Sequence, residues 1–564
     1  MKKYWPTAEK YWLIGAVLLI VFLGLHLPAL HLPYHQDEWK AVWSVAQGAD
    51  SAGSMFAHPP LTALAFRLDA TIFGLNNMRV LPLIFSVISA ALLFLVVRKR
   101  SDIITGLIAV GLYTVCFYAI LASLMIDTDG AILPTLFLLA VYAYDTAKAP
   151  QSNKRILRWS LVAIILIIGC LVKLSFVLVI AAVAVDFLLD HRQSISKKNT
   201  ISAVLALIVF LIMLVIIFFG LHFVYSQFSL GSMIDHARSF MHIRGRNYSQ
   251  VIFEGIKALL YLSPLLVMPL VFIRRETFEK TRLYWIYLIF GFIFYFILFD
   301  FSRGTLDKYL MFTIIPLCAI TATVIRDVFS GSKASKSSIS GRSYALLAGI
   351  VLSLGLYFVQ FVNNYVPSLY PKTEWLNRVI HLKWNMLIPF NGGSGPMGFY
   401  VSFLFIALVF LISFVIMIAG IFKPTWRQSA LAILICLGLT YSLIFTEEYV
   451  FGKISGSASE VLRSSLTYVK ADKSGDQYIT YNDIGAYELS AMHKYAGRFY
   501  VAPELEGTNL ERLGKFNGKY LIVDMPRIDT NSGYAIFFKS CTVLASSTSG
   551  QIKGYIYSCN RQAQ

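Results

Sequence analysis

The sequence predicts an α-helical membrane protein with about 13 transmembrane helices and a small external α/β domain at its C-terminal end. Of the 564 residues, 57% are hydrophobic and only 14% are charged. Apolar runs long enough to cross a bilayer recur through residues 1–446, separated by charged loops. From residue 447 onward, short strand-like runs alternate with helical patterns. We therefore expect a membrane-embedded domain at 1–446 and an external α/β domain at 447–564.

The formal charge of the chain is +18 at pH 7. A strongly basic chain can bind nucleic acid or another polyanion. Here many of the Lys and Arg residues stand in short loops between apolar runs, which is where the positive-inside rule places them. We attribute the charge to membrane topology and expect membrane lipids, and no nucleic acid, as partners.

The first apolar run, residues 12–30, is predicted to be an uncleaved span with a cytoplasmic N-terminus. Lys2 and Lys3 precede it, as basic residues precede a secretory signal. The run is long for the apolar core of such a signal, and no small-x-small cleavage site follows it. Residues 31–77 then form a long first outer loop, whose short apolar pieces are expected to be interfacial helices.

Charged loops divide the rest of the membrane domain into twelve further spans. Arg98, Lys99 and Arg100 fix the end of the second span on the inner side. The run 159–189 is too long for one ordinary span, and Lys173 splits it into two short spans that meet on the outer side. The remaining loops are expected inside near 148–158, 191–198, 274–275, 326–343 and 423, and outside near 127–129, 236–246, 300–303 and 366–398. Thirteen spans place the C-terminal domain outside.

The C-terminal domain contains strand patterns at 477–481, 498–501 and 519–523, and a helical pattern at 460–469. Cys541 and Cys559 lie at equal distances on either side of Gly550, within a turn-like sequence. A hairpin centred there would place the two cysteines opposite each other, which predicts a disulfide and an oxidising, external compartment. The other four cysteines lie in apolar runs, where small buried side chains are expected.

Asp37 and Glu38 form the first acidic cluster, directly after the first span. Carboxylates at the end of a span are costly unless they face water, a cation or a partner. On an extended or irregular loop, two adjacent side chains would point in different directions. Asp37 could then act as a general base towards a hydroxyl group. Alternatively, Asp37 caps a helix that starts at Glu38, and the two roles are compatible.

The triplet Asp127-Thr128-Asp129 forms the second acidic cluster, after the third span. Two carboxylates at this spacing can share a divalent cation with a phosphate or can orient a sugar. The alternative is a cap for the helix that begins at Gly130. If the spans alternate, both acidic clusters fall on the same side of the membrane, which predicts an active site at that face.

Lys173 is the one basic residue between Arg158 and His191. A lysine within so apolar a run needs a counter-charge or an anion, and a lipid phosphate would serve. The alternative is that its side chain snorkels to the head groups. Arg303 and Lys308, at the start of the tenth span, invite the same interpretation.

Two further candidates for substrate binding rest on weaker patterns. Arg244 lies with His242 and Arg246 in an outer cationic loop, where a solvated loop is the simpler interpretation. His58 precedes two prolines and could bind a metal or the substrate, although no second ligand accompanies it in the sequence. The sequence shows no phosphate-binding glycine loop, no zinc-type cysteine pattern and no serine-nucleophile elbow.

In order along the chain, these motifs resemble those of glycosyltransferase family 39, a GT-C membrane family that includes the protein O-mannosyltransferases and the lipid A aminoarabinose transferases. The resemblance rests on the Asp-Glu pair, His58-Pro59-Pro60-Leu61, the acidic triplet, the lone Lys173, and Arg303-x4-Lys308-Tyr309. It implies a polyprenyl-phosphate sugar donor reached from the outer leaflet of the plasma (inner) membrane. It also implies that Asp37 is the general base, that Glu38 is its partner, and that Lys173 meets the lipid phosphate. Transfer in one step would invert the anomeric carbon.

The sequence departs from the protein O-mannosyltransferases because it lacks a recognisable sugar-binding trefoil insertion and ends in an α/β domain. The acceptor therefore remains open between a lipid, a polysaccharide and a protein. The competing class is a transporter or flippase of lipid-linked sugars, which would show ionisable residues near the middle of several spans. Here the acidic residues gather at the outer ends. These patterns require no cofactor. The one cofactor that they suggest is a divalent cation that Asp127 and Asp129 could share.

Overall fold

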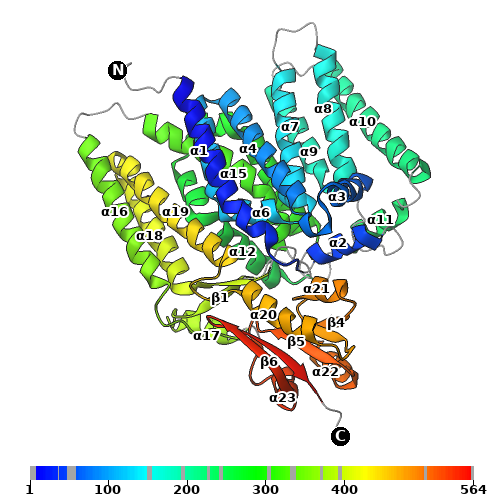
Figure 1. Cartoon of the computed structure of the whole chain (residues 1–564). Coiled ribbons are helices and arrows are strands. Elements are labelled where there is room, and N and C mark those ends of the chain that lie inside the picture. Colours follow the sequence, from blue (N-terminus) through cyan, green and yellow to red (C-terminus); the bar gives the residue numbers. More distant parts are fainter. Residues whose placement is uncertain are drawn as a thin grey trace. The chain divides into compact units, whose positions relative to one another are not determined.

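The computed structural model describes residues 8–35, 37–47, 59–148, 155–191, 197–224, 229–240, 246–300, 306–330, 338–368, 373–390, 397–500 and 505–559. The chain forms two compact units (Figure 1). The first comprises Met1–Leu30 and Lys40–Ser335, and the second His31–Trp39 and Lys336–Gln564. The packing units therefore divide near residues 30, 39 and 335, and not at the expected boundary between residues 446 and 447. The expected division by compartment is a separate matter and stays a prediction.

The first unit is helical. Most of its helices are long and apolar, and short 3-10 or π-helical turns continue several of them. The α-helices are α1 (Ala8–His26), α3 (Pro60–Phe73), α4 (Val80–Arg100), α5 (Ile103–Val115), α6 (Phe117–Leu124), α7 (Leu133–Ala147), α8 (Arg155–Val172), α9 (Val177–Asp190), α10 (Lys197–Val224), α11 (Leu230–Ser239), α12 (Tyr248–Val267), α13 (Arg275–Phe292), α14 (Leu306–Tyr309) and α15 (Ile314–Ser330). Helix α2 (Asp37–Gln47) begins in the second unit and continues in the first.

The chain is a multi-pass membrane protein. Among the described residues of both units, nine helices are long and apolar enough to cross a bilayer. Helices α5 and α6, bent by 69° at Cys116, form a tenth span if they are counted together. Each of the thirteen expected spans falls on a helix or a helix pair, but α9 has only 14 residues and α10 and α16 contribute shorter apolar stretches. The count of thirteen is therefore not confirmed.

Ion pairs join helix ends that the sequence assigns to the inner side. Arg100 at the end of α4 binds Asp145 of α7 at 2.6 Å. Arg282 of α13 binds Asp186 of α9 at 2.7 Å, and Lys148 after α7 approaches the same carboxylate at 3.4 Å. Because the C-terminal ends of α4, α7 and α9 gather here with the first half of α13, their packing agrees with spans that alternate in direction.

Three long helices of the second unit pack side by side: α16 (Ser338–Val359), α18 (Phe403–Phe422) and α19 (Arg427–Val450). The chain between α16 and α18 contains α17 (Thr373–Ile380) and an antiparallel pair of strands, β1 (Leu387–Phe390) and β2 (Phe399–Ser402). Strand β2 runs directly into α18, whose first turn is capped by the Ser402 hydroxyl accepting from the Phe405 N–H.

The C-terminal part is an α/β domain, as the sequence predicts. Its five-stranded sheet has the order β4-β3-β5-β7-β6; β3, β4 and β5 are parallel, and β7 pairs antiparallel with β5 and β6. The strands are β3 (Tyr478–Tyr481), β4 (Tyr495–Phe499), β5 (Lys519–Val523), β6 (Thr542–Ser549) and β7 (Ile552–Ser558), and the helices are α20 (Ala458–Ala471), α21 (Ala486–Ala491), α22 (Glu506–Lys515) and α23 (Gly533–Lys539).

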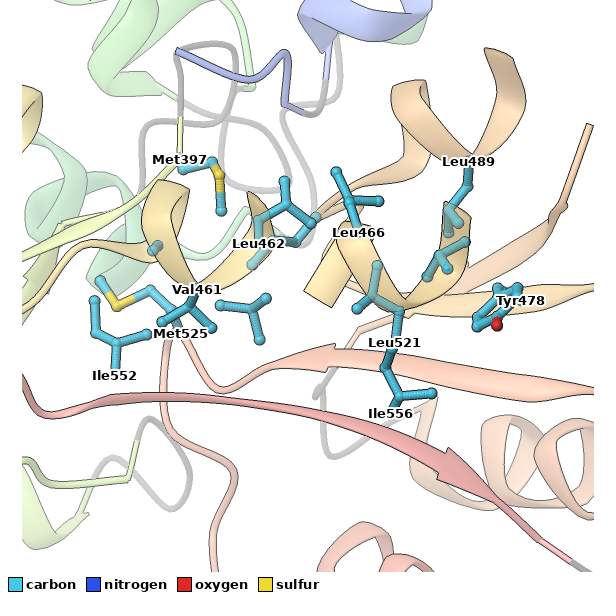
Figure 2. Close-up of a cluster of buried hydrophobic side chains, with 14 of the residues drawn as sticks. Met397, Val461, Leu462, Leu466, Tyr478, Leu489, Leu521, Met525, Ile552 and Ile556 are labelled. Carbon is cyan, nitrogen blue, oxygen red and sulfur yellow. The ribbon is translucent and has the colours of Figure 1, made fainter. Parts of the chain in front are cut away.

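Alternation along the strands gives the sheet two buried faces. On β5, Leu521 and Val523 face one cluster, and Tyr520 and Ile522 face the other. The first cluster packs the sheet against α20, and Figure 2 shows Leu462 and other side chains of this cluster. The second cluster packs the opposite face against α22 and α23, so that the domain has three layers.

Cys541 and Cys559 form a disulfide at the base of the β6–β7 hairpin. The turn of the hairpin contains Gly550, whose φ of +54° is a left-handed backbone conformation that favours glycine. The loop is short, and its register places Thr542 opposite Ser558, so the neighbouring cysteines meet.

Candidate active site

The acidic triplet lies where α6 ends and the fourth span begins. Thr128–Ile132 forms a π-helical turn that leads into α7. The carboxylate of Asp127 accepts from the backbone N–H of Thr128 at 2.5 Å and of Asp129 at 3.2 Å. Asp127 is therefore a helix cap, which was one of the two expected roles.

Gly130 allows this turn to approach the preceding helix. A Cβ atom at Gly130 would lie 2.1 Å from the carbonyl oxygen of Ala122, on backbone that cannot rotate away. Only a residue without a side chain fits there. The position of the two carboxylates thus depends on the close contact of α6 with the turn.

Each carboxylate of the triplet pairs with a lysine. Lys173 binds Asp129, and Lys308 binds Asp127. The Lys173 and Asp129 side chains are only 11% and 5% exposed, so each charge depends on the other for its stability. The structure thus brings together Asp127, Asp129, Lys173 and Lys308, which the sequence predicts to lie on the same side of the membrane.

Local breaks in helices position both lysines. Lys173 has an extended backbone between α8 and the short turn Leu174–Phe176, and it interrupts the run at the point where the sequence predicts two spans to meet. Lys308 lies in the single-turn helix α14. The ring of Tyr309 lies 4.8 Å from the Lys173 Nζ and 5.5 Å from the Lys308 Nζ, so both ammonium groups gain a cation–π contact.

A pocket of about 210 Å³ opens beside this ion-pair cluster. Lys173, His236, Tyr295 and Tyr309 are the main polar side chains of its lining. The rest is largely apolar and includes Leu174, Val177, Met233, Phe240, Phe294 and Phe299. A cation within such a lining suits a ligand that joins an anionic group to a hydrocarbon chain.

A second buried ion pair precedes Lys308 in the chain and was not anticipated. Lys257 of α12 binds Asp307 at 2.8 Å and lies 3.8 Å from Glu254. The hydroxyl of Tyr118 donates to the backbone carbonyl of Asp307. The signal was present in the sequence, because Glu254 and Lys257 interrupt an apolar run just as Lys173 does. These contacts fix the turn that carries Lys308.

The Asp37–Glu38 pair belongs to the second compact unit, and its expected convergence with the acidic triplet stays a prediction. The pair lies in the first turn of α2, not on an irregular loop. The Glu38 N–H donates to the His35 carbonyl at 3.0 Å, and the His35 N–H approaches the Glu38 carboxylate at 3.5 Å. Glu38 is fully buried, and its contact with the His35 N–H resembles that of a capping box at the start of a helix.

Three of the expected binding residues, His58, Arg244 and Arg303, lie outside the described residues. For Arg246, the third cation of this loop, the expected solvated position is wrong. Its side chain is 1% exposed, lies 3.7 Å from Asp300, and donates to the carbonyls of Phe296 and Ile297 at 2.9 Å. Carbonyls left unpaired at the end of a helix attract a cation, which explains its burial.

The donor set does not fit a divalent cation as it stands. Asp127 and Asp129 are each bound to a lysine, and the described residues contain no group of three or more His, Cys, Asp or Glu side chains that could hold a metal. We assign no chemical step to a metal, and the expected cation at this site stays untested.

The chain is similar to known proteins in part of its sequence and in its fold. Residues 57–218, which include Asp127, Asp129 and Lys173, match the family described as dolichyl-phosphate-mannose-protein mannosyltransferase. The structure resembles ArnT from Cupriavidus metallidurans bound to undecaprenyl phosphate, with a TM-score of 0.56 at 12% identity, and the apo state of the same protein, with 0.52 at 14%. Both alignments cover 98% of each chain. No curated protein sequence matches significantly.

The chain is thus a multi-pass membrane protein whose fold is of the GT-C type, as in ArnT. The resemblance stated from the sequence is confirmed at the level of this fold.

Proposed function

We propose that this protein is a glycosyltransferase that takes a sugar from a polyprenyl-phosphate donor and transfers it to an acceptor hydroxyl at the outer membrane face. The observation that supports this most directly is the position of Lys173, which is ion-paired and lines a largely apolar pocket. The description of the matched family names dolichyl phosphate, and that of the ArnT structure names undecaprenyl phosphate. Both are lipid phosphates.

In this proposal the lysines stabilise the leaving group. As the bond between the anomeric carbon and the phosphate oxygen breaks, negative charge develops on the lipid phosphate. Lys173 and Lys308, already held by Asp129 and Asp127, offer fixed positive charge at that moment. Prepositioned cations cost little reorganisation when the charge appears. Arg303, five residues before Lys308, is proposed as a further cation for the same phosphate.

Asp37 is proposed as the general base. Its carboxylate takes the proton of the acceptor hydroxyl while the hydroxyl oxygen bonds to the anomeric carbon and the lipid phosphate leaves. A single displacement of this kind inverts the anomeric configuration. Glu38 is proposed to support Asp37 by fixing the first turn of α2.

The proposed location is the plasma membrane, with a cytoplasmic N-terminus and the α/β domain outside. The disulfide between Cys541 and Cys559 supports this orientation, because such bonds persist in oxidising compartments. The acceptor is proposed to be a lipid, a polysaccharide or a protein.

The test is transfer by the purified protein carrying Asp37→Asn. The amide keeps the size of the carboxylate and one acceptor oxygen but cannot take a proton, so turnover should fall by about 100-fold or more while the melting temperature stays unchanged. Asp235→Asn is the matched control, since that side chain is 76% exposed on α11. Wild-type turnover by the Asp37 variant would disprove the assignment.

The same preparation distinguishes an enzyme from a flippase. Reconstituted vesicles with labelled polyprenyl-phosphate sugar should yield a new glycosidic product and free polyprenyl phosphate. Movement of intact donor between leaflets, without product, would instead establish the transporter class.

A further inference from the structure

A charged cluster lies at the carboxyl ends of the parallel strands β3 and β4. Asp483, just after β3, is fully buried and binds the guanidinium of Arg498 on β4. The hydroxyl of Tyr500 donates to the same carboxylate at 2.9 Å, and the Arg498 guanidinium lies 4.7 Å from the Tyr500 ring. The carboxyl edge of parallel strands is where α/β sheets commonly place functional groups.

The backbone at this edge is held in an uncommon conformation. Asn482 and Asp483 have φ values of +52° and +61°, in the left-handed region that few residues with side chains adopt. Such conformations persist only where the surrounding structure enforces them, and they gather at functional sites. Arg512 of α22 adds a hydrogen bond to the Arg498 carbonyl, which fixes the strand from its other side.

The segment that carries Asp37 packs against this part of the domain. The ring of Tyr34 meets that of Tyr487 on α21 at 4.9 Å, and Trp39 meets Tyr495, the first residue of β4, at 5.6 Å. All four residues belong to the second compact unit. These contacts hold the chain on both sides of Asp37.

The charge of Asp37 acts on the cluster of Arg498 and Tyr500. Burial lowers the pKa of Arg498, while the charges of Tyr500 and Asp37 oppose that change and Arg512 adds to it. Burial raises the pKa of Tyr500 to about 12. The positive charge of Arg498 opposes this rise, and the negative charge of Asp37 adds to it. The ring contacts of Tyr34 and Trp39 place the segment that carries Asp37 beside α21 and the start of β4, and the charge of Asp37 acts on Arg498 and Tyr500.

We propose that Arg498 is a positioning residue for the general base: fixed by Asp483 and Tyr500, its guanidinium holds the Asp37 carboxylate in the orientation needed to take the acceptor proton. This inference rests on the proposed role of Asp37. It gives the C-terminal α/β domain a direct part in the reaction.

A guanidinium is suited to this task because it is planar, always charged and presents several N–H donors in fixed directions. It can bind Asp483 on one edge and direct other donors to a second carboxylate. A lysine would keep the charge but lose the fixed geometry. Loss of Arg498 should therefore affect the rate of the chemical step more than the binding of the donor.

The experiment compares Arg498→Met, Arg498→Lys and Arg527→Met in the full-length protein. Arg527 lies in the same domain, donates to the Val366 carbonyl at 3.0 Å, and serves as the control for removing a cation. We expect kcat to fall about 10- to 100-fold for Arg498→Met with an unchanged KM for the donor, because displacement of a catalytic group by about 1 Å can cost 100-fold. Arg498→Lys should recover part of kcat, and Arg527→Met should retain it.

Wild-type kcat in Arg498→Met, or a raised donor KM with unchanged kcat, would overturn the inference. If Arg498→Met does not fold, Arg498→Lys decides: a loss of kcat at constant KM and melting temperature supports positioning, and full activity refutes it. Asp37→Asn, measured in parallel, separates the two proposals. An active Asp37→Asn protein defeats the general base itself, whereas an inactive one beside a fully active Arg498→Met protein defeats only the inference about Arg498.

Discussion

Replacing Lys173 by methionine removes one charge from a buried ion pair and leaves the Asp129 carboxylate behind. Both side chains are largely buried, so the pair belongs with interior pairs, where the loss of one partner costs about 3–5 kcal/mol, and not with surface pairs, which contribute about 0–1 kcal/mol. We expect the lower figure, about 3 kcal/mol, because Lys308 remains on the neighbouring carboxylate Asp127.

A double-mutant cycle separates the stability of the pair from its function. Asp129→Asn combined with Lys173→Met leaves no unpaired charge, so it should recover most of the stability lost in the Lys173→Met single variant. It should not recover donor binding, because the cation that meets the lipid phosphate is still missing. Equilibrium unfolding in detergent measures the first effect, and binding of polyprenyl phosphate measures the second.

Two results would refute this reasoning. If the double variant is no more stable than Lys173→Met, the pair does not contribute to the fold as its burial indicates. If the double variant binds polyprenyl phosphate as tightly as the wild type, Lys173 is not the phosphate ligand, and Arg303 becomes the better candidate.

Gly130→Ala should lower both activity and melting temperature, because its Cβ would lie 2.1 Å from the Ala122 carbonyl oxygen; an active, stable variant would contradict the close contact. A reporter fused after the last residue should be active outside the cell, and Cys541 and Cys559 should react with thiol reagents only after reduction; a cytoplasmic reporter would change the span count. Burial raises the pKa of Asp524 to about 6, so its contribution to stability, complete below about pH 4, is lost as the pH rises through 6. The gain in melting temperature of Asp524→Asn over the wild type should therefore grow from pH 5 to pH 8, and a constant difference would contradict this.

Features determined by local sequence were predictable. Lys173 interrupts an apolar run, and the helices break there. Cys541 and Cys559 flank a glycine turn symmetrically, and they pair. Strand β4 begins at Tyr495, three residues before the predicted start at Arg498. The prediction began too late because Gly497 weakens the strand pattern of the sequence at this point.

Features determined by distant partners were not predictable from local patterns. The pairing of Lys257 with Asp307 depends on how α12 packs against α14, about 50 positions later in the chain. Likewise, no local pattern shows that Tyr34 meets Tyr487 or that Trp39 meets Tyr495. The role of Glu38 at the helix start became visible only once His35 was placed beside it.

The core of the α/β domain includes residues that precede residue 447. Val366, Leu387, Met397 and Tyr400 are buried in the same cluster as Leu462 and its neighbours, and Figure 2 shows Met397 next to Leu462. A fragment beginning at 447 would leave this cluster exposed on one side, so it should be insoluble when expressed alone. For the same reason, recombination between related chains could exchange this domain only together with the segment from residue 366 to the start of α18. Selection would then act on the segment from residue 366 to α18 and on the C-terminal domain as one inherited block.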